Sequence, residues 1–139
     1  MIFLDTNLLL RYLLRDEETQ YQAVRSLLLQ PRSYSASSTV MLELAWMLKT
    51  QKWQRAEIVA AFTALLDGLP NFKPQGADAL RDTVAAYARG MDFADALHLV
   101  ASRQAEAEAF ATADRGLAKQ AEKQKLQPPV ELIRFTPHD

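Results

Sequence analysis

Short apolar runs alternate along the chain with longer amphipathic stretches. Apolar runs bounded by polar residues indicate buried strands, whereas apolar residues that recur every three or four positions indicate helices. The pattern predicts strands at residues 1–4, 33–37, 71–73, 108–112 and 131–135. Between them it predicts helices at residues 8–14, 16–29, 40–48, 54–66, 77–88, 93–105 and 115–125. Strands that alternate with helices favour an α/β fold with a mostly parallel sheet.

Composition narrows the chemistry that this fold can carry. The 139 residues suit one domain, which we expect to span residues 1–139. Cysteine is absent, which excludes thiolate zinc sites and cysteine nucleophiles. The formal net charge of −1 excludes a strongly basic nucleic-acid coat, although not a local basic rim. The four glycines form neither a dinucleotide-binding nor a P-loop motif.

No targeting or membrane-spanning segment is evident. The apolar N-terminal stretch carries Asp5 and Arg11, and it lacks the basic start of a signal peptide. The longest stretch without a charged residue, 33–42, is half polar, and a membrane span needs about 18 apolar residues. We therefore expect a cytoplasmic protein without membrane association.

Two aspartates follow predicted strands. Asp5 ends the first strand and Asp114 follows the fourth. Ligands of open parallel sheets bind beyond the carboxyl ends of strands, so both are candidate site residues. Each also precedes a helix, where an aspartate commonly acts as the N-cap. Sequence position alone gives these two interpretations equal weight.

Glu43 lies in the most apolar predicted helix. Val40, Leu44, Met47 and Leu48 form a stripe at helical spacing, and Glu43 is three residues after Val40 and four before Met47. A carboxylate on an apolar face is costly unless it is paired or bound to a metal. We therefore favour a functional role, the alternative being a glutamate at the edge of the stripe that reaches solvent.

Asp92 and Asp95 open the helix over residues 93–105 and share one of its faces. For Asp92, capping is the better interpretation, whereas Asp95 is the stronger site candidate. Carboxylates repel one another at short range, so a cluster with Asp5, Glu43 and Asp114 needs a cation. Hard oxygen ligands select Mg²⁺ or Mn²⁺ over zinc.

Four sequence blocks resemble the PIN domains of VapC-type toxins, in order and spacing. They are FLDTNLLLRYLL, the isolated Glu43 in its apolar helix, MDFADALHLVAS and FATADRGLAK. The resemblance covers essentially the whole chain and implies a three-layer α/β/α fold around a central, mostly parallel sheet of about five strands. The fourth block departs from the usual pattern, because Leu117 replaces an aromatic residue.

The resemblance also implies the residues of the site. The catalytic acids fall on Asp5, Glu43, Asp95 and Asp114. Asp5 and Asp95 would hold the metal, supported by Glu43, Asp114 and Asp92. Thr112 and Asn7 are expected to contact the substrate or to support the acids. Cations near these blocks are candidates for a basic rim: Arg11, Arg15, Arg89, Arg115 and Lys119.

The implied activity is that of a Mg²⁺-dependent endoribonuclease, with Mn²⁺ as a substitute ion, that hydrolyses RNA by means of a metal-activated water. Its implied partners are RNA, a small cognate antitoxin and a second copy of the chain, within a toxin–antitoxin hetero-oligomer. An amphipathic antitoxin segment would dock on apolar residues of the first four helices. Candidates for this surface are Leu9, Leu13, Leu27, Leu28, Val59, Phe62 and Leu66.

Two other functions remain open. One is a PIN-type nuclease of RNA processing that is not a toxin. The other is an aspartate-based phosphatase, which also begins with a strand ending in aspartate. The latter is weaker, because Asn7 stands where such phosphatases need a second acid.

Overall fold

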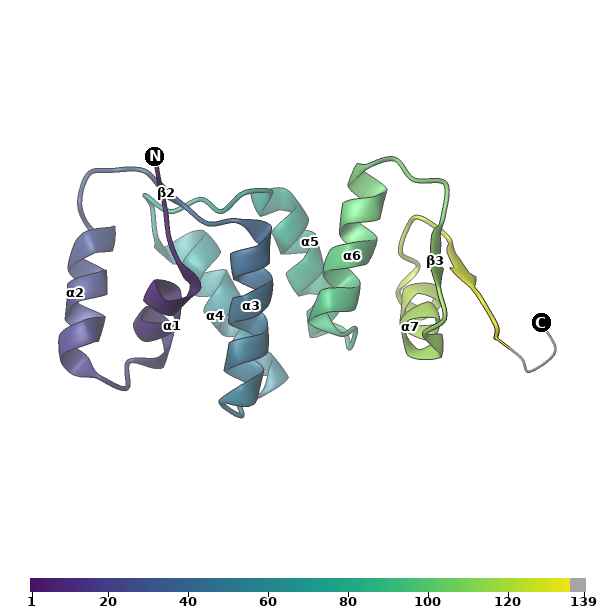
Figure 1. Ribbon diagram of the computed structural model, residues 1–139, viewed down its shortest axis with the longest axis horizontal. Coiled ribbons are helices and arrows are strands. Elements are labelled where there is room, and N and C mark those ends of the chain that lie inside the picture. Colours follow the sequence, from purple (N-terminus) through teal and green to yellow (C-terminus); the bar gives the residue numbers. More distant parts are fainter. Residues whose placement is uncertain (136–139) are drawn as a thin grey trace. The chain divides into compact units, whose positions relative to one another are not determined.

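The computed structural model describes residues 1–135, which fall into two compact units (Figure 1). Unit 1 comprises Met1–Ala77 and unit 2 comprises Asp78–Asp139. Each unit contains helices and one pair of parallel strands. Within residues 1–135, no helix is long and apolar enough to span a bilayer.

Unit 1 is built around a parallel pair of very short strands. Its elements are β1 (Ile2–Phe3), α1 (Thr6–Leu14), α2 (Glu18–Leu28), β2 (Tyr34–Ser35), α3 (Ser38–Thr50) and α4 (Arg55–Gly68). Ile2 lies opposite Tyr34 in the ladder, and Phe72 forms a single parallel bridge to Tyr34. β2 therefore lies between β1 and the segment around Phe72.

Helix packing supplies the interior of unit 1. α1 packs against α2 and α3, and α3 packs against α4. Leu9, Leu44 and Phe62 from three of these helices are completely buried. The buried Tyr34 hydroxyl donates a hydrogen bond to the carbonyl of Leu27, at 2.6 Å, and so ties β2 to α2.

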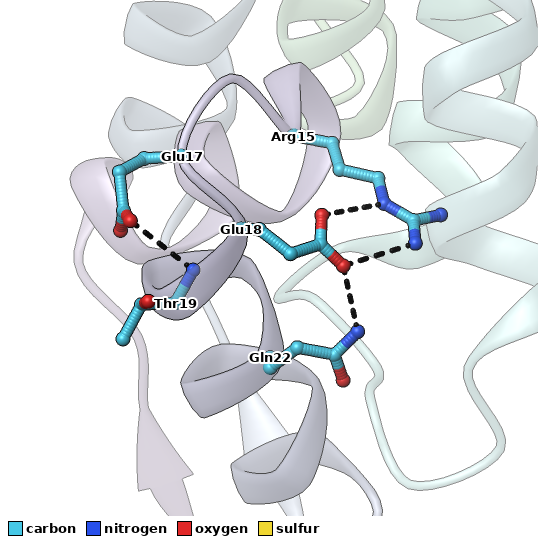
Figure 2. A network of polar contacts seen from close by, with 5 residues as sticks. All are labelled: Arg15, Glu17, Glu18, Thr19 and Gln22. Carbon is cyan, nitrogen blue, oxygen red and sulfur yellow. Dashed lines mark hydrogen bonds and ion pairs between the residues drawn. The ribbon is translucent and has the colours of Figure 1, made fainter.

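Local contacts set the turn from α1 to α2 (Figure 2). Arg15 ends α1 in the left-handed region, at φ 49°. Its guanidinium donates from Nε and Nη2 to the two carboxylate oxygens of Glu18, at 3.3 and 3.2 Å, and lies 4.2 Å from the centre of the Tyr21 ring. The Glu17 side chain caps α2 by accepting hydrogen bonds from the backbone amides of Thr19 and Gln20.

Unit 2 places the second pair of parallel strands beside its last helix. Its helices are α5 (Ala77–Ala88), which begins at the last residue of unit 1, α6 (Phe93–Gln104) and α7 (Arg115–Gln124), and its strands are β3 (Phe110–Thr112) and β4 (Val130–Leu132). Both strands contact α7. Met91, Leu99 and Ala121 belong to its buried core, against which Phe110 and Val130 pack. An ion pair between Arg103 and Asp82 joins α6 to α5.

The α/β character and the parallel pairing are confirmed, but the predicted five-stranded sheet is not. Residues 1–135 contain two sheets of two strands each, and the segment at 71–73 contributes only the Phe72 bridge. The strands are two or three residues long. With only two or three paired positions each, these ladders contribute little to stability. Parallel pairing is also slightly less stable per residue than antiparallel pairing. The helix at 40–48 also begins earlier than predicted, at Ser38, with Ser37 as its cap.

Candidate functional site

Three of the candidate aspartates are helix N-caps. The Asp5 side chain accepts from the Thr6 amide at 2.7 Å, at the start of α1. Asp92 accepts from the Asp95 amide at 3.1 Å and Asp114 from the Leu117 amide at 3.1 Å, at the starts of α6 and α7. The capping interpretation is therefore correct for Asp5, Asp92 and Asp114.

Capping leaves half of each carboxylate available. In all three aspartates the capping atom is Oδ1, and within residues 1–135 no hydrogen bond reaches Oδ2. All three side chains belong to exposed residues. An ionised carboxylate accepts through both oxygens, so a cap and a ligand can share one side chain. Capping thus orients these three carboxylates and leaves Oδ2 of each able to bind a ligand.

Unit 2 gathers three of the acids around one pocket. Asp92, Asp95 and Asp114 line a pocket of about 430 Å³ at the starts of α6 and α7. The rest of its lining consists of Gly90, Met91, Gly116, Leu117, Lys119, Gln120 and Lys123. The pocket brings residues 90–95 together with residues 114–123, which lie about twenty positions further along the chain.

Asp95 is the acid most affected by this setting. Partial burial raises the pKa of its carboxyl group, the negative charges of Asp92 and Asp114 raise it further, and His98 opposes the change. The charged form of Asp95 is therefore the destabilised form in the protein without ligands. A cation in the pocket would relieve the same repulsion.

Neighbouring residues hold Asp114 in place. The Thr112 hydroxyl accepts a hydrogen bond from the Asp114 amide at 3.0 Å, which agrees with a supporting role for Thr112. A Cβ at position 116 would lie 3.1 Å from Asp114 Oδ1, so the absence of a side chain at Gly116 avoids a close contact with this carboxylate. Gly90 also lines the pocket, and its backbone has a φ of +117°, a conformation that L-residues rarely adopt.

The predicted apolar setting of Glu43 is wrong. The buried face of α3 consists of Met41, Leu44, Ala45 and Leu48. Met41 and Ala45 take the places of the predicted Val40 and Met47 in this stripe, which rotates the centre of the buried face by roughly 65° and leaves Glu43 exposed. Its carboxylate nevertheless has a defined neighbour, because the hydroxyl of the buried Thr6 donates to Glu43 Oε1 at 3.3 Å.

The predicted acids thus fall into two sets. Asp5 and Glu43 belong to unit 1, where Thr6 contacts both, whereas Asp92, Asp95 and Asp114 line the pocket of unit 2. Asn7 lies exposed in the first turn of α1. Within the part of the chain described, no three Asp, Glu or His side chains come close enough to hold one metal ion. Asp92, Asp95 and Asp114 still bring carboxylate oxygens to the pocket, and these are the ligands that a hard divalent ion takes.

Two residues next to the acids were not predicted from the sequence. Thr6 contacts both Asp5 and Glu43, and its position between Asp5 and Asn7 was the available signal. Lys123 lines the pocket, and its spacing of four residues from Lys119 was a signal too. Among the proposed basic rim, Arg11 and Arg15 are instead paired with Asp16 and Glu18.

Comparison with known proteins adds the family. The model of the PIN domain family matches residues 2–123, which is most of the chain. PIN domains are generally nucleases, and they typically use a divalent metal. No curated protein and no solved structure matches the chain.

Proposed function

The chain belongs to the PIN domain family, and we propose that it is a Mg²⁺-dependent endoribonuclease that acts as the toxin of a toxin–antitoxin pair. The observation that carries the nuclease proposal is the pocket of unit 2, which Asp92, Asp95 and Asp114 line, with an unused oxygen on the capping carboxylates of Asp92 and Asp114. The four sequence blocks that resemble VapC-type toxins support the toxin assignment.

The acidic side chains define what the protein itself contributes. Asp95 and Asp5 are the proposed metal ligands, with Glu43, Asp114 and Asp92 in support. A bound divalent ion would supply charge for the phosphate and lower the pKa of a water molecule. Glu43 would orient that water or accept its proton at Oε2, because Oε1 already accepts from Thr6.

Cleavage assays test the nuclease proposal directly. Purified protein incubated with total RNA should produce fragments in Mg²⁺ and none in EDTA, and Asp95→Asn should remove the activity. Mapping of fragment 5′ ends after brief expression would give the target sequence. EDTA-resistant cleavage, or full activity of Asp95→Asn, would overturn the assignment.

Three of the seven residues named as candidates for the antitoxin surface are not available for docking. Leu9, Leu28 and Phe62 are buried in unit 1 and are excluded as docking residues. Large apolar side chains that do face solvent are Trp46 on α3, 66% exposed, and Leu29 at the end of α2, 56% exposed. We propose that an amphipathic antitoxin segment covers such residues.

Expression in cells distinguishes a toxin from an RNA-processing PIN nuclease. Induction should arrest growth, and co-expression of the adjacent gene should restore growth and yield a co-purifying small protein. An active nuclease without growth arrest would favour the processing role. We also propose a homodimer, which light scattering at micromolar concentration tests.

A further inference from the structure

One face of α7 carries a row of three cations. Arg115, Lys119 and Lys123 are spaced by four residues, which places them on one side of the helix at intervals of about 6 Å along its axis. All three are exposed, whereas Leu117 and Ala121 on the other side of α7 are buried. We call these three residues the α7 cation row.

The stability of α7 does not account for the whole α7 cation row. Lys123 lies in the last turn, where the macrodipole favours a cation, but Arg115 at the first helical residue opposes the macrodipole. Like charges at i and i+4 also destabilise a helix. Within residues 1–135, none of the three forms an ion pair, whereas Arg11, Arg15 and Arg103 each pair with an acid. Such a row is therefore available to an external anion.

The row leads into the acidic pocket. Lys119 and Lys123 line the same pocket as Asp92, Asp95 and Asp114, yet neither lysine pairs with any of these acids. The pocket thus keeps both signs of charge side by side and uncompensated by one another. A ligand that brings anionic oxygens and a divalent ion together would satisfy both sets.

We propose that Arg115, Lys119 and Lys123 bind successive phosphates of a single-stranded RNA and direct the strand to the acids of the unit 2 pocket. This inference rests on the proposed nuclease function and names the residues that hold its substrate. The regular spacing fits a polymer with one charge per repeat. An acidic protein segment fits less well, because its carboxylates would meet Asp92 and Asp114 without bringing a cation.

Salt-dependent binding tests the α7 cation row apart from catalysis. Binding of a short labelled single-stranded RNA is measured in EDTA by fluorescence anisotropy over a range of salt concentrations. The slope of log K against log salt is about −0.7 per neutralised phosphate of a single strand. The double variant Lys119→Gln/Lys123→Gln should therefore reduce the slope by about 1.4, and adding Arg115→Gln by about 0.7 more.

A matched control loses the same charge elsewhere. Lys49→Gln/Lys73→Gln changes two exposed lysines of unit 1 and should leave the slope unchanged. Thermal unfolding should show that the row variants are about as stable as the wild type, because the reduced repulsion along α7 offsets the loss of Lys123 near the C-terminus of the helix.

The outcomes separate the two proposals. Wild-type protein that cleaves and binds RNA, with row and control variants of equal slope, overturns the row and leaves the nuclease standing. Wild-type protein without RNA binding or cleavage overturns both. If the row variants keep their RNA slope but lose a co-purifying acidic protein, the row belongs to a protein interface and the inference is wrong.

Discussion

Asp95 differs from the other pocket acids because its amide, and not its carboxylate, takes part in the capping of α6. The Asp95 side chain projects from the first turn of α6. Partial burial and the negative charges of Asp92 and Asp114 raise the pKa of its carboxyl group. For a carboxyl group, a folded pKa above the unfolded value means that ionisation opposes folding. The proposed function of Asp95 and the stability of the fold therefore make opposite demands on its charge.

The Asp95→Asn variant should expose that conflict in EDTA. Wild-type stability should fall as pH rises from the unfolded pKa through the higher folded pKa, because the native state holds its proton longer. The asparagine variant lacks this titration, so it should be the more stable protein at neutral pH and equal to the wild type in acid. Urea unfolding at several pH values measures the difference, and a wild type that is the more stable at neutral pH would contradict it.

Glu43 and Thr6 form a second testable pair. Glu43→Gln keeps an acceptor for the Thr6 hydroxyl, so unfolding in EDTA should change little. If Glu43 serves the reaction, cleavage should fall by about 10²-fold or more, as on loss of a positioned acid–base group. A packing role alone would leave cleavage near normal.

Thr6→Val provides the companion measurement. Valine keeps the buried shape of Thr6 but removes the donor to Glu43. Cleavage should fall less than in Glu43→Gln, because the carboxylate remains while its orientation is lost. Equal losses in both variants would show instead that Thr6 has a role of its own.

Sequence reasoning located acids more readily than it located their surroundings. Asp5, Asp92 and Asp114 were recognisable because an aspartate between a loop or strand and a helix has few roles. The exposure of Glu43 was not recognisable from sequence, because a small rotation of the buried face of α3 decides whether Glu43 lies on that face or in solvent. Contacts such as Thr6 with Glu43 join residues 37 positions apart, and nothing in local sequence encodes them.

At the level of elements, the start of α7 combines capping with the pocket. Asp114 accepts from the Leu117 amide, and Thr112 accepts from the Asp114 amide. Asparagine at 114 preserves the cap, whereas alanine removes it at a cost of about 1 kcal/mol. We therefore expect Asp114→Asn to unfold like the wild type and Asp114→Ala to be less stable.

Activity should not follow that ranking. Both Asp114 variants lose the negative charge that faces the pocket, so both should lose cleavage to a similar degree. Denaturant unfolding and RNA cleavage on the same preparations provide the comparison. Retained cleavage in Asp114→Asn would reduce Asp114 to a helix cap.

Helices were more predictable than strands for a physical reason. All seven predicted helices are present, because each has its own periodicity, caps or breakers, such as Glu17 before α2. A strand depends on partners distant in sequence, and ladders of two or three residues leave little pattern to detect. Phe72 illustrates this, since its predicted strand is reduced to one bridge.

At the scale of the whole molecule, Mg²⁺ should stabilise the fold. A ligand that binds only the native state adds RT ln(1 + [L]/Kd), which is about 1.4 kcal/mol at ten times Kd. For a chain of this length the midpoint of unfolding should rise by about 4 °C. Calorimetry with Mg²⁺ and with EDTA measures the effect, and Asp95→Asn should abolish it. An equal shift in Asp95→Asn would place the ion elsewhere.

If the capping carboxylates also hold the proposed ion, binding of the ion is coupled to local opening of two helix starts. When the first turn of α6 or α7 frays, Asp92 or Asp114 loses the amide that orients it, and the pocket loses a donor in the same event. By reciprocity, an ion held at Oδ2 must slow that fraying. The amide protons of Asp95 and Leu117 would then exchange with solvent more slowly in Mg²⁺, so two backbone sites act as reporters of occupancy without any RNA present.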